Sequence, residues 1–101
     1  MIKKGGIYTR DEEIRVVFEV IDEVVYYYYA NDERLKDTVT KEKVDEIIQE
    51  DLVVGFFLDN YYSLSEKHFD DLNDGYLGQI DESLLIELQN NHFFIWNSQY
   101  L

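Results

Sequence analysis

Carboxylate side chains recur at a spacing of four residues in two segments of this chain. The sets are Glu42, Glu46 and Glu50, and Glu66, Asp70 and Asp74. On an α-helix, residues four apart lie above one another, so each set would form a line of like charges with a rise of ~6 Å per step. Such pairs destabilise an isolated helix by roughly 0.2–0.5 kcal/mol each. Helix stability therefore does not explain either set.

The positions of the acids within these two segments add to the penalty. Glu50 and Asp51 would end the first helix, and Asp70, Asp71 and Asp74 would burden the end of the second. Negative charge is unfavourable there because the carboxyl end of a helix already carries partial negative charge. The rows are interpreted either as ordinary solvated faces of an acidic protein or as a surface for a basic partner. Such surfaces steer association and set specificity.

The sequence gives little indication of metal binding or catalysis. The segment from Asp70 to Gly75 superficially resembles an EF-hand loop, but Leu72 would occupy loop position 3, where a ligand is needed. No metal or cofactor is therefore predicted. The histidines, His68 and His92, form no H-E-x-x-H motif, and the chain has no cysteine nucleophile. No catalytic residue is assigned, and an enzyme is not expected.

Four consecutive tyrosines, from Tyr26 to Tyr29, lie in a segment that favours a β-strand. Successive side chains of a strand point to opposite faces, so Tyr27 and Tyr29 share one face. Tyrosine is enriched at protein interfaces, which makes these two rings candidates for partner binding. The alternative is that the rings pack in the core or cover the sheet.

The elements that would position these residues follow from hydrophobic periodicity and from turn and cap signals. Alternation predicts strands over residues 6–10, 13–21 and 24–30, with a hairpin at Asp22-Glu23. The apolar spacing predicts a helix over 40–50 with Thr40 as its N-cap. An apolar run predicts a buried strand over 52–58.

The remainder of the chain predicts two more helices and one strand. A capping box from Ser63 to Glu66 predicts a helix that runs to about residue 73 and stops at Gly75. Asp81 would cap a helix over 82–89, and aromatic residues predict a strand over 92–96. The predicted fold class is α+β: a small single domain over residues 1–101, with a mostly antiparallel twisted sheet of four to five strands and two or three short helices.

The overall charge limits the classes of partner. The 101 residues include 22 Asp and Glu against 9 Lys and Arg, a net charge of -13, and Lys67 is the only Lys or Arg after Lys43. A protein that binds nucleic acid directly needs a basic surface, and so does one that binds anionic lipid. The sequence therefore predicts neither. With no signal peptide or membrane span expected and no cysteine, the predicted location is the cytoplasm, that of the host cell if the gene is phage-encoded.

In size, charge and absence of cysteine, the chain resembles phage-encoded inhibitors of host defence, including anti-CRISPR proteins and other DNA mimics. This resemblance is one of composition and implies a partner that is a basic nucleic-acid-binding protein or a nuclease, whose groove the acidic protein would block. One alternative is an immunity or antitoxin protein that neutralises a nuclease toxin. Another is a homo-oligomeric accessory protein, in which a tyrosine-rich sheet forms a homodimer face.

Overall fold

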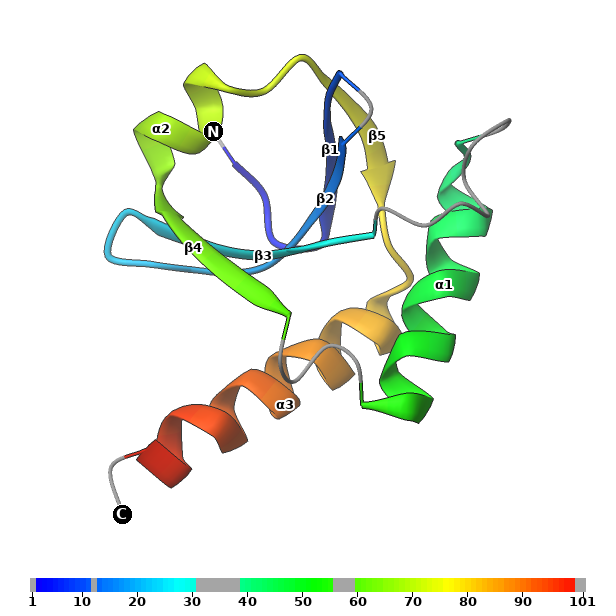
Figure 1. The fold of residues 1–101 in the computed structure, drawn as a ribbon, viewed down its shortest axis with the longest axis vertical. Helices are drawn as coiled ribbons and strands as arrows, with labels where there is room; N and C mark the ends of the chain where they lie inside the picture. Colours follow the sequence, from blue (N-terminus) through cyan, green and yellow to red (C-terminus); the bar gives the residue numbers. More distant parts are fainter. Residues whose placement is uncertain (1, 12, 31–38, 56–59, 100–101) are drawn as a thin grey trace.

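A computed structural model describes residues 2–11, 13–30, 39–55 and 60–99 of the chain. Five strands and three helices follow one another in the order shown in Figure 1. The elements are β1 (Gly6–Arg10), β2 (Glu13–Ile21), β3 (Val24–Tyr29), α1 (Lys41–Val54), β4 (Tyr61–Ser65), α2 (Glu66–Asp71), β5 (Gly75–Gln79) and α3 (Glu82–Gln99). The fold is α+β, as predicted.

The strands form one antiparallel sheet in the order β4-β3-β2-β1-β5. The first three strands agree with the prediction, apart from Ala30 at the end of β3. Asp22 and Glu23 join β2 to β3 with φ angles of 51° and 66°. Positive φ at both central residues is what a type I′ hairpin requires, even though this residue pair rarely supplies it.

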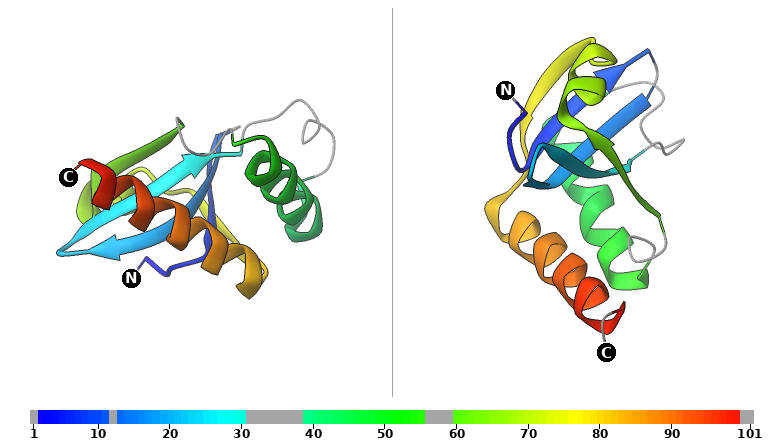
Figure 2. Two further views of the ribbon diagram at one scale, coloured as in Figure 1. Left: turned by 90° about the horizontal axis from the view of Figure 1, so that it is seen from below. Right: turned by 90° about the vertical axis from the view of Figure 1, so that its left-hand side faces the viewer.

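Helices cover both faces of the sheet, and Figure 2 shows α1 and α3 on one side and α2 on the other. Val44 and Ile48 of α1 and Leu88 of α3 pack against Val16 and Tyr28 of the sheet. On the opposite face, Phe69 of α2 packs with the side chains of four residues from the sheet and with one from the segment before β1. These five are Ile2, Tyr8, Val17, Val25 and Tyr27. The sheet is therefore buried on both faces.

Helix α1 begins where the sequence predicts and ends later. The Thr40 Oγ1 atom accepts a hydrogen bond from the Lys43 N–H at 3.2 Å, which confirms the N-cap. The helix continues to Val54 and ends at Gly55, whose φ is 76°. The prediction of a strand over 52–58 is thus wrong for residues 52–54, and residues 56–58 lie outside the described part. A short apolar run fits a helix as well as a strand, and here the glycine cap sets the boundary.

The largest differences lie after residue 60. Residues 61–65 form strand β4 where a helix cap was expected at Ser63, and Ser65 is the N-cap of α2. Gly75 begins β5, a strand that was not predicted. The expected strand over 92–96 is also wrong, because α3 continues through it. The preference of aromatic residues for strands is weak, and tertiary context can override it. Five strands result, although only three were predicted in the right place.

Candidate functional site

The acidic row on α1, defined as Glu42, Glu46 and Glu50, lies on the exposed side of the helix. The opposite side of the helix packs into the core through Val44 and Ile48. The last turn of α1 has no basic residue. All three carboxylates of the acidic row are therefore on residues that the helix leaves exposed, as the sequence predicts.

One lysine of α1, Lys41, forms an ion pair with Asp45, which does not belong to the acidic row. Lys41 Nζ lies 2.7 Å from Asp45 Oδ2, and this hydrogen bond raises the pKa of Lys41. Asp45 Oδ1 also accepts a hydrogen bond from the Asp81 N–H at 3.1 Å, which links α1 to the start of α3. Asp81 caps α3 as predicted, because its Oδ1 accepts from the Ser83 N–H and hydroxyl, and these bonds lower the pKa of Asp81. Asp45 and Asp81 therefore have a structural role, since they link α1 to α3 and cap α3.

The second predicted row does not exist as a line on one helix. Helix α2 ends at Asp71, so Asp74 lies beyond it in the segment before β5. Glu66 Oε1 accepts a hydrogen bond from the Ile2 N–H at 3.3 Å, and Asp74 Oδ2 accepts one from the Asp11 N–H at 3.0 Å. These two carboxylates hold backbone groups that are distant in sequence. Asp74 is exposed, as are Asp70 and Asp71, whereas Glu66 is partly buried.

The two acidic segments therefore do not combine into one surface. Helix α1 covers one face of the sheet and α2 covers the other, and Figure 1 shows them at opposite sides of the molecule. A partner that contacts α1 in a flat interface cannot reach the carboxylates of α2 at the same time. The predicted partner-binding residues divide into two candidate surfaces.

The tyrosines of β3 are less accessible than expected. Tyr27 is only 4% exposed, because α2 places Phe69 over it with ring centroids 5.2 Å apart. Tyr29 is half-buried, and Tyr62 of β4 packs against it at 5.2 Å. Burial, followed by a hydrogen bond with Tyr29, raises the pKa of Tyr27 to about 12. Tyr62, at 49% exposure, is the ring of this cluster that a partner can reach.

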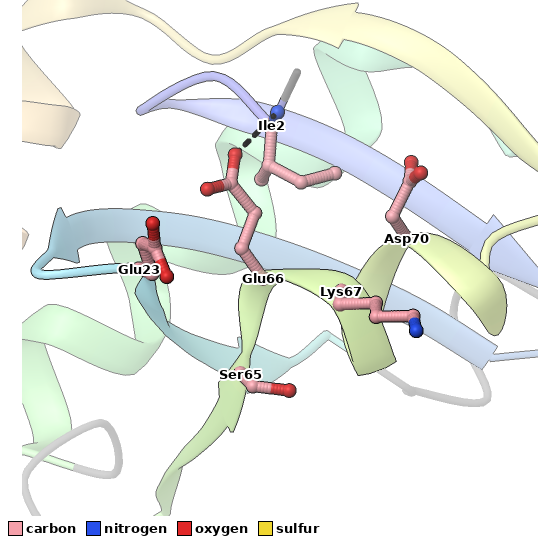
Figure 3. Close-up of a pocket in the computed structure, with 6 residues that line it drawn as sticks. All are labelled: Ile2, Glu23, Ser65, Glu66, Lys67 and Asp70. Carbon is pink, nitrogen blue, oxygen red and sulfur yellow. Dashed lines mark hydrogen bonds between the residues drawn. The ribbon is translucent and has the colours of Figure 1, made fainter.

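A pocket of about 310 Å³ lies where β4 passes into α2. It is lined by one apolar side chain, one hydroxyl, one ammonium and three carboxylates: Ile2, Ser65, Lys67, Glu23, Glu66 and Asp70 (Figure 3). Sequence reasoning found two of these carboxylates and missed Glu23. The hairpin prediction supplied a signal, because it placed Glu23 in a tight turn, but only the pairing of β3 with β4 brings that turn to α2.

A serine–histidine contact beside the pocket is a helix cap. Ser65 Oγ and His68 Nδ1 lie 3.1 Å apart, and the same hydroxyl accepts a hydrogen bond from the His68 N–H at 3.2 Å. Both side chains are exposed, and within the described residues no third side chain orients the imidazole. A catalytic triad needs that third group, so the contact does not amount to one.

Across residues 2–11, 13–30, 39–55 and 60–99, no group of three or more acidic or histidine side chains is arranged to hold a metal ion. None of the helices in those ranges is both long enough and apolar enough to cross a membrane. Comparison with known proteins found no match to a family model, to a curated protein or to a solved structure. The functional argument therefore depends on geometry and charge.

Proposed function

We propose that this protein inhibits a basic nucleic-acid-binding protein or nuclease in the cytoplasm by occupying its nucleic-acid groove. The acidic row on α1 is the observation that carries this proposal. Its three carboxylates stand on one exposed line with a rise of ~6 Å per step. A basic groove that holds phosphates presents Lys and Arg side chains that such a line of charge can engage.

The surroundings of the row strengthen the negative field. Residues 39–55 and 81–99 together hold eight Asp and Glu against two lysines, and one of these, Lys41, is paired with Asp45. Charge of one sign over a helical surface raises the rate at which an oppositely charged partner associates. These two segments therefore carry a net charge of -6, nearly half of the total of -13.

An apolar contact is available at the end of the row. Val53 and Val54, one turn beyond Glu50, are 82% and 75% exposed. Interfaces commonly combine apolar contacts with charged groups at their rim. The valines would add contact area beside the carboxylates, which a purely electrostatic complex lacks.

The proposal is tested by capture from a lysate of the host cell on the immobilised protein. Three forms are compared: the wild type, the row variant (Glu42→Gln, Glu46→Gln and Glu50→Gln) and a control variant (Asp11→Asn, Glu13→Gln and Asp22→Asn). Both variants change the net charge from -13 to -10, but the control leaves α1 intact. We expect a captured protein that duplex DNA elutes, that the row variant loses and that the control variant retains.

Two results would contradict groove occupation. If duplex DNA does not compete for the captured protein, the acidic surface does not occupy its nucleic-acid site. If both variants lose the captured protein equally, net charge rather than the α1 row controls binding. A captured nuclease encoded beside this gene would identify the protein as an immunity or antitoxin protein that acts by the same mechanism.

A further inference from the structure

The two edge strands of the sheet carry no charged residue, although 31% of the chain is Asp, Glu, Lys or Arg. Strand β4 has the sequence Tyr-Tyr-Ser-Leu-Ser, and β5 has Gly-Tyr-Leu-Gly-Gln. Proteins usually protect sheet edges with charged side chains, proline or bulges, because an open edge can pair with another strand. The absence of charge at both edges therefore needs an explanation.

The two edges differ in regularity. The pairing of β5 with β1 shifts register between Ile7 and Tyr8, and Gly78 has a φ of 139°. Such an irregularity disrupts the ladder and protects that edge. The pairing of β4 with β3 runs without a shift from Val24–Ser65 to Tyr28–Tyr61. Strand β4 is therefore the edge on which a further strand can be added.

The hydrogen bonds between β3 and β4 identify the peptide groups that face outward. The Glu66 N–H donates to the Glu23 carbonyl oxygen at 2.7 Å. With Val24 opposite Ser65, this bond makes 24–65 a pair without mutual hydrogen bonds, and the type alternates along the ladder. The N–H and C=O groups of Ser63 and the N–H of Ser65 consequently point away from β3.

Side chains next to this edge supply specific contacts. Tyr62, on the face covered by α2, packs against the rings of Tyr27 and Tyr29 and leaves about half of its surface exposed. An exposed aromatic ring attracts cationic side chains through its face. The edge therefore combines backbone donors and acceptors with a surface that favours a cation.

The pocket at the end of β4 also favours a cationic side chain. Figure 3 shows the Glu66 carboxylate against Ile2, with Glu23 to its left and Asp70 further along α2 to its right. The three carboxylates outnumber the one ammonium, that of Lys67. A Lys or Arg side chain combines an apolar stem with a charged head, which matches Ile2 beside carboxylates.

We propose that β4 receives an extended segment of a partner protein as a sixth strand, with a lysine or arginine of that segment in the pocket. Main-chain hydrogen bonds would supply affinity, and the pocket would supply specificity for a basic side chain. A second copy of this chain is a poorer occupant, because it carries the same net charge of -13 and would repel the first copy. The inference goes beyond groove blocking, since it concerns the face opposite to α1.

The test uses the isotope-labelled protein and two synthetic peptides of equal length, one of alternating lysine and threonine and one of alternating glutamate and threonine. We expect the lysine peptide to shift the backbone amide resonances of Ser63 and Ser65 and the glutamate peptide to leave them unchanged. Ser63→Pro removes the outward N–H without removing a bond to β3, and should weaken lysine-peptide binding about tenfold. Ser63→Ala, which keeps that N–H, should bind like the wild type.

A second variant tests the pocket and leaves the strand intact. Glu23→Gln with Asp70→Asn should weaken the lysine peptide about threefold or more, whereas the α1 row variant should bind it normally. The proposal is overturned if both peptides bind equally, if the lysine peptide shifts α1 instead of β4, or if neither amide moves. It is also overturned if the Ser63 amide shifts with protein concentration alone, since this would identify a second copy as the occupant.

Discussion

The guanidinium carbon of Arg15 lies 4.1 Å from the centre of the Phe69 ring, so a buried cation connects the central strand of the sheet to α2. Arg15 is 2% exposed, and its Nη2 donates a hydrogen bond to the Leu72 carbonyl oxygen at 3.2 Å. Its Nε has no hydrogen-bond partner among the described residues. In a chain with 22 Asp and Glu residues, this cation is held by the rings of Phe69 and Tyr27 and by a carbonyl oxygen.

The Arg15–Phe69 contact predicts that Arg15→Lys, which keeps the charge, is more destabilising than Arg15→Met, which removes it. Arg15→Lys would bury a compact, strongly hydrated ammonium and should lower the free energy of unfolding by about 2–3 kcal/mol. Arg15→Met keeps a long apolar side chain and should lower it by less than about 1.5 kcal/mol. Urea denaturation of both variants measures the difference. The opposite ranking would show that the charge itself stabilises the fold.

A second prediction concerns the backbone conformation of Gly55 at the carboxyl end of α1. Gly55 has a φ of 76°, so Gly55→Ala should destabilise the protein by roughly 1–2 kcal/mol. Gly55→Asn should be milder, because asparagine tolerates this region of φ. Thermal unfolding of the two variants tests the ranking. Equal melting temperatures for Gly55→Ala and the wild type would mean that the helix ends differently in solution.

The buried tyrosine makes stability depend on pH in the alkaline range. The pKa of Tyr27 rises from 10.0 to about 12, so the folded state favours the neutral phenol. The stabilisation is complete below about pH 10 and is lost as the pH rises through about 12. Urea denaturation across this range should show the decline, and Tyr27→Phe should reduce its slope. An unchanged slope in Tyr27→Phe would assign the decline to other groups, such as Tyr8 and Tyr28, whose pKa values burial also raises.

The acidic row predicts how binding depends on salt. Each exposed ion pair with a partner contributes about 0.2–1 kcal/mol, so the row variant should bind the captured partner about threefold to a hundredfold more weakly at low salt. The difference between the wild type and the variant should shrink as salt rises, because screening weakens exposed pairs. Titrations at several salt concentrations measure both effects. A constant difference would point to the valines at the end of α1.

The sequence was most informative where one structural period dominates. Residues 13–21 alternate so regularly that both ends of β2 were predicted, and Thr40 marked the start of α1 because its side chain competes for a backbone N–H. The position of the α1 row on an exposed face followed from the same helical period. These features depend on local interactions, which a single sequence contains.

Features that depend on distant partners could not be predicted in this way. Strands β4 and β5 have five residues each and exist because β3 and β1 offer them a ladder. The second acidic row was not found because α2 has only six residues, and Asp74 instead binds the N–H of Asp11. The pocket was not predicted for the same reason, since its lining comes from residues 2, 23, 65–67 and 70.

The order of the strands also implies an order of assembly. Strands β1, β2 and β3 are consecutive hairpins, whereas Tyr8 of β1 pairs with Tyr76 of β5, sixty-eight positions further along the chain. Closing a long loop costs chain entropy before the contacts that stabilise it have formed. Local hairpins therefore form first. We therefore expect the three-strand meander to form in the folding transition state and both edges to join afterwards. Substitutions at the centre of the sheet would then slow folding, and substitutions in β4 or β5 would mainly speed unfolding.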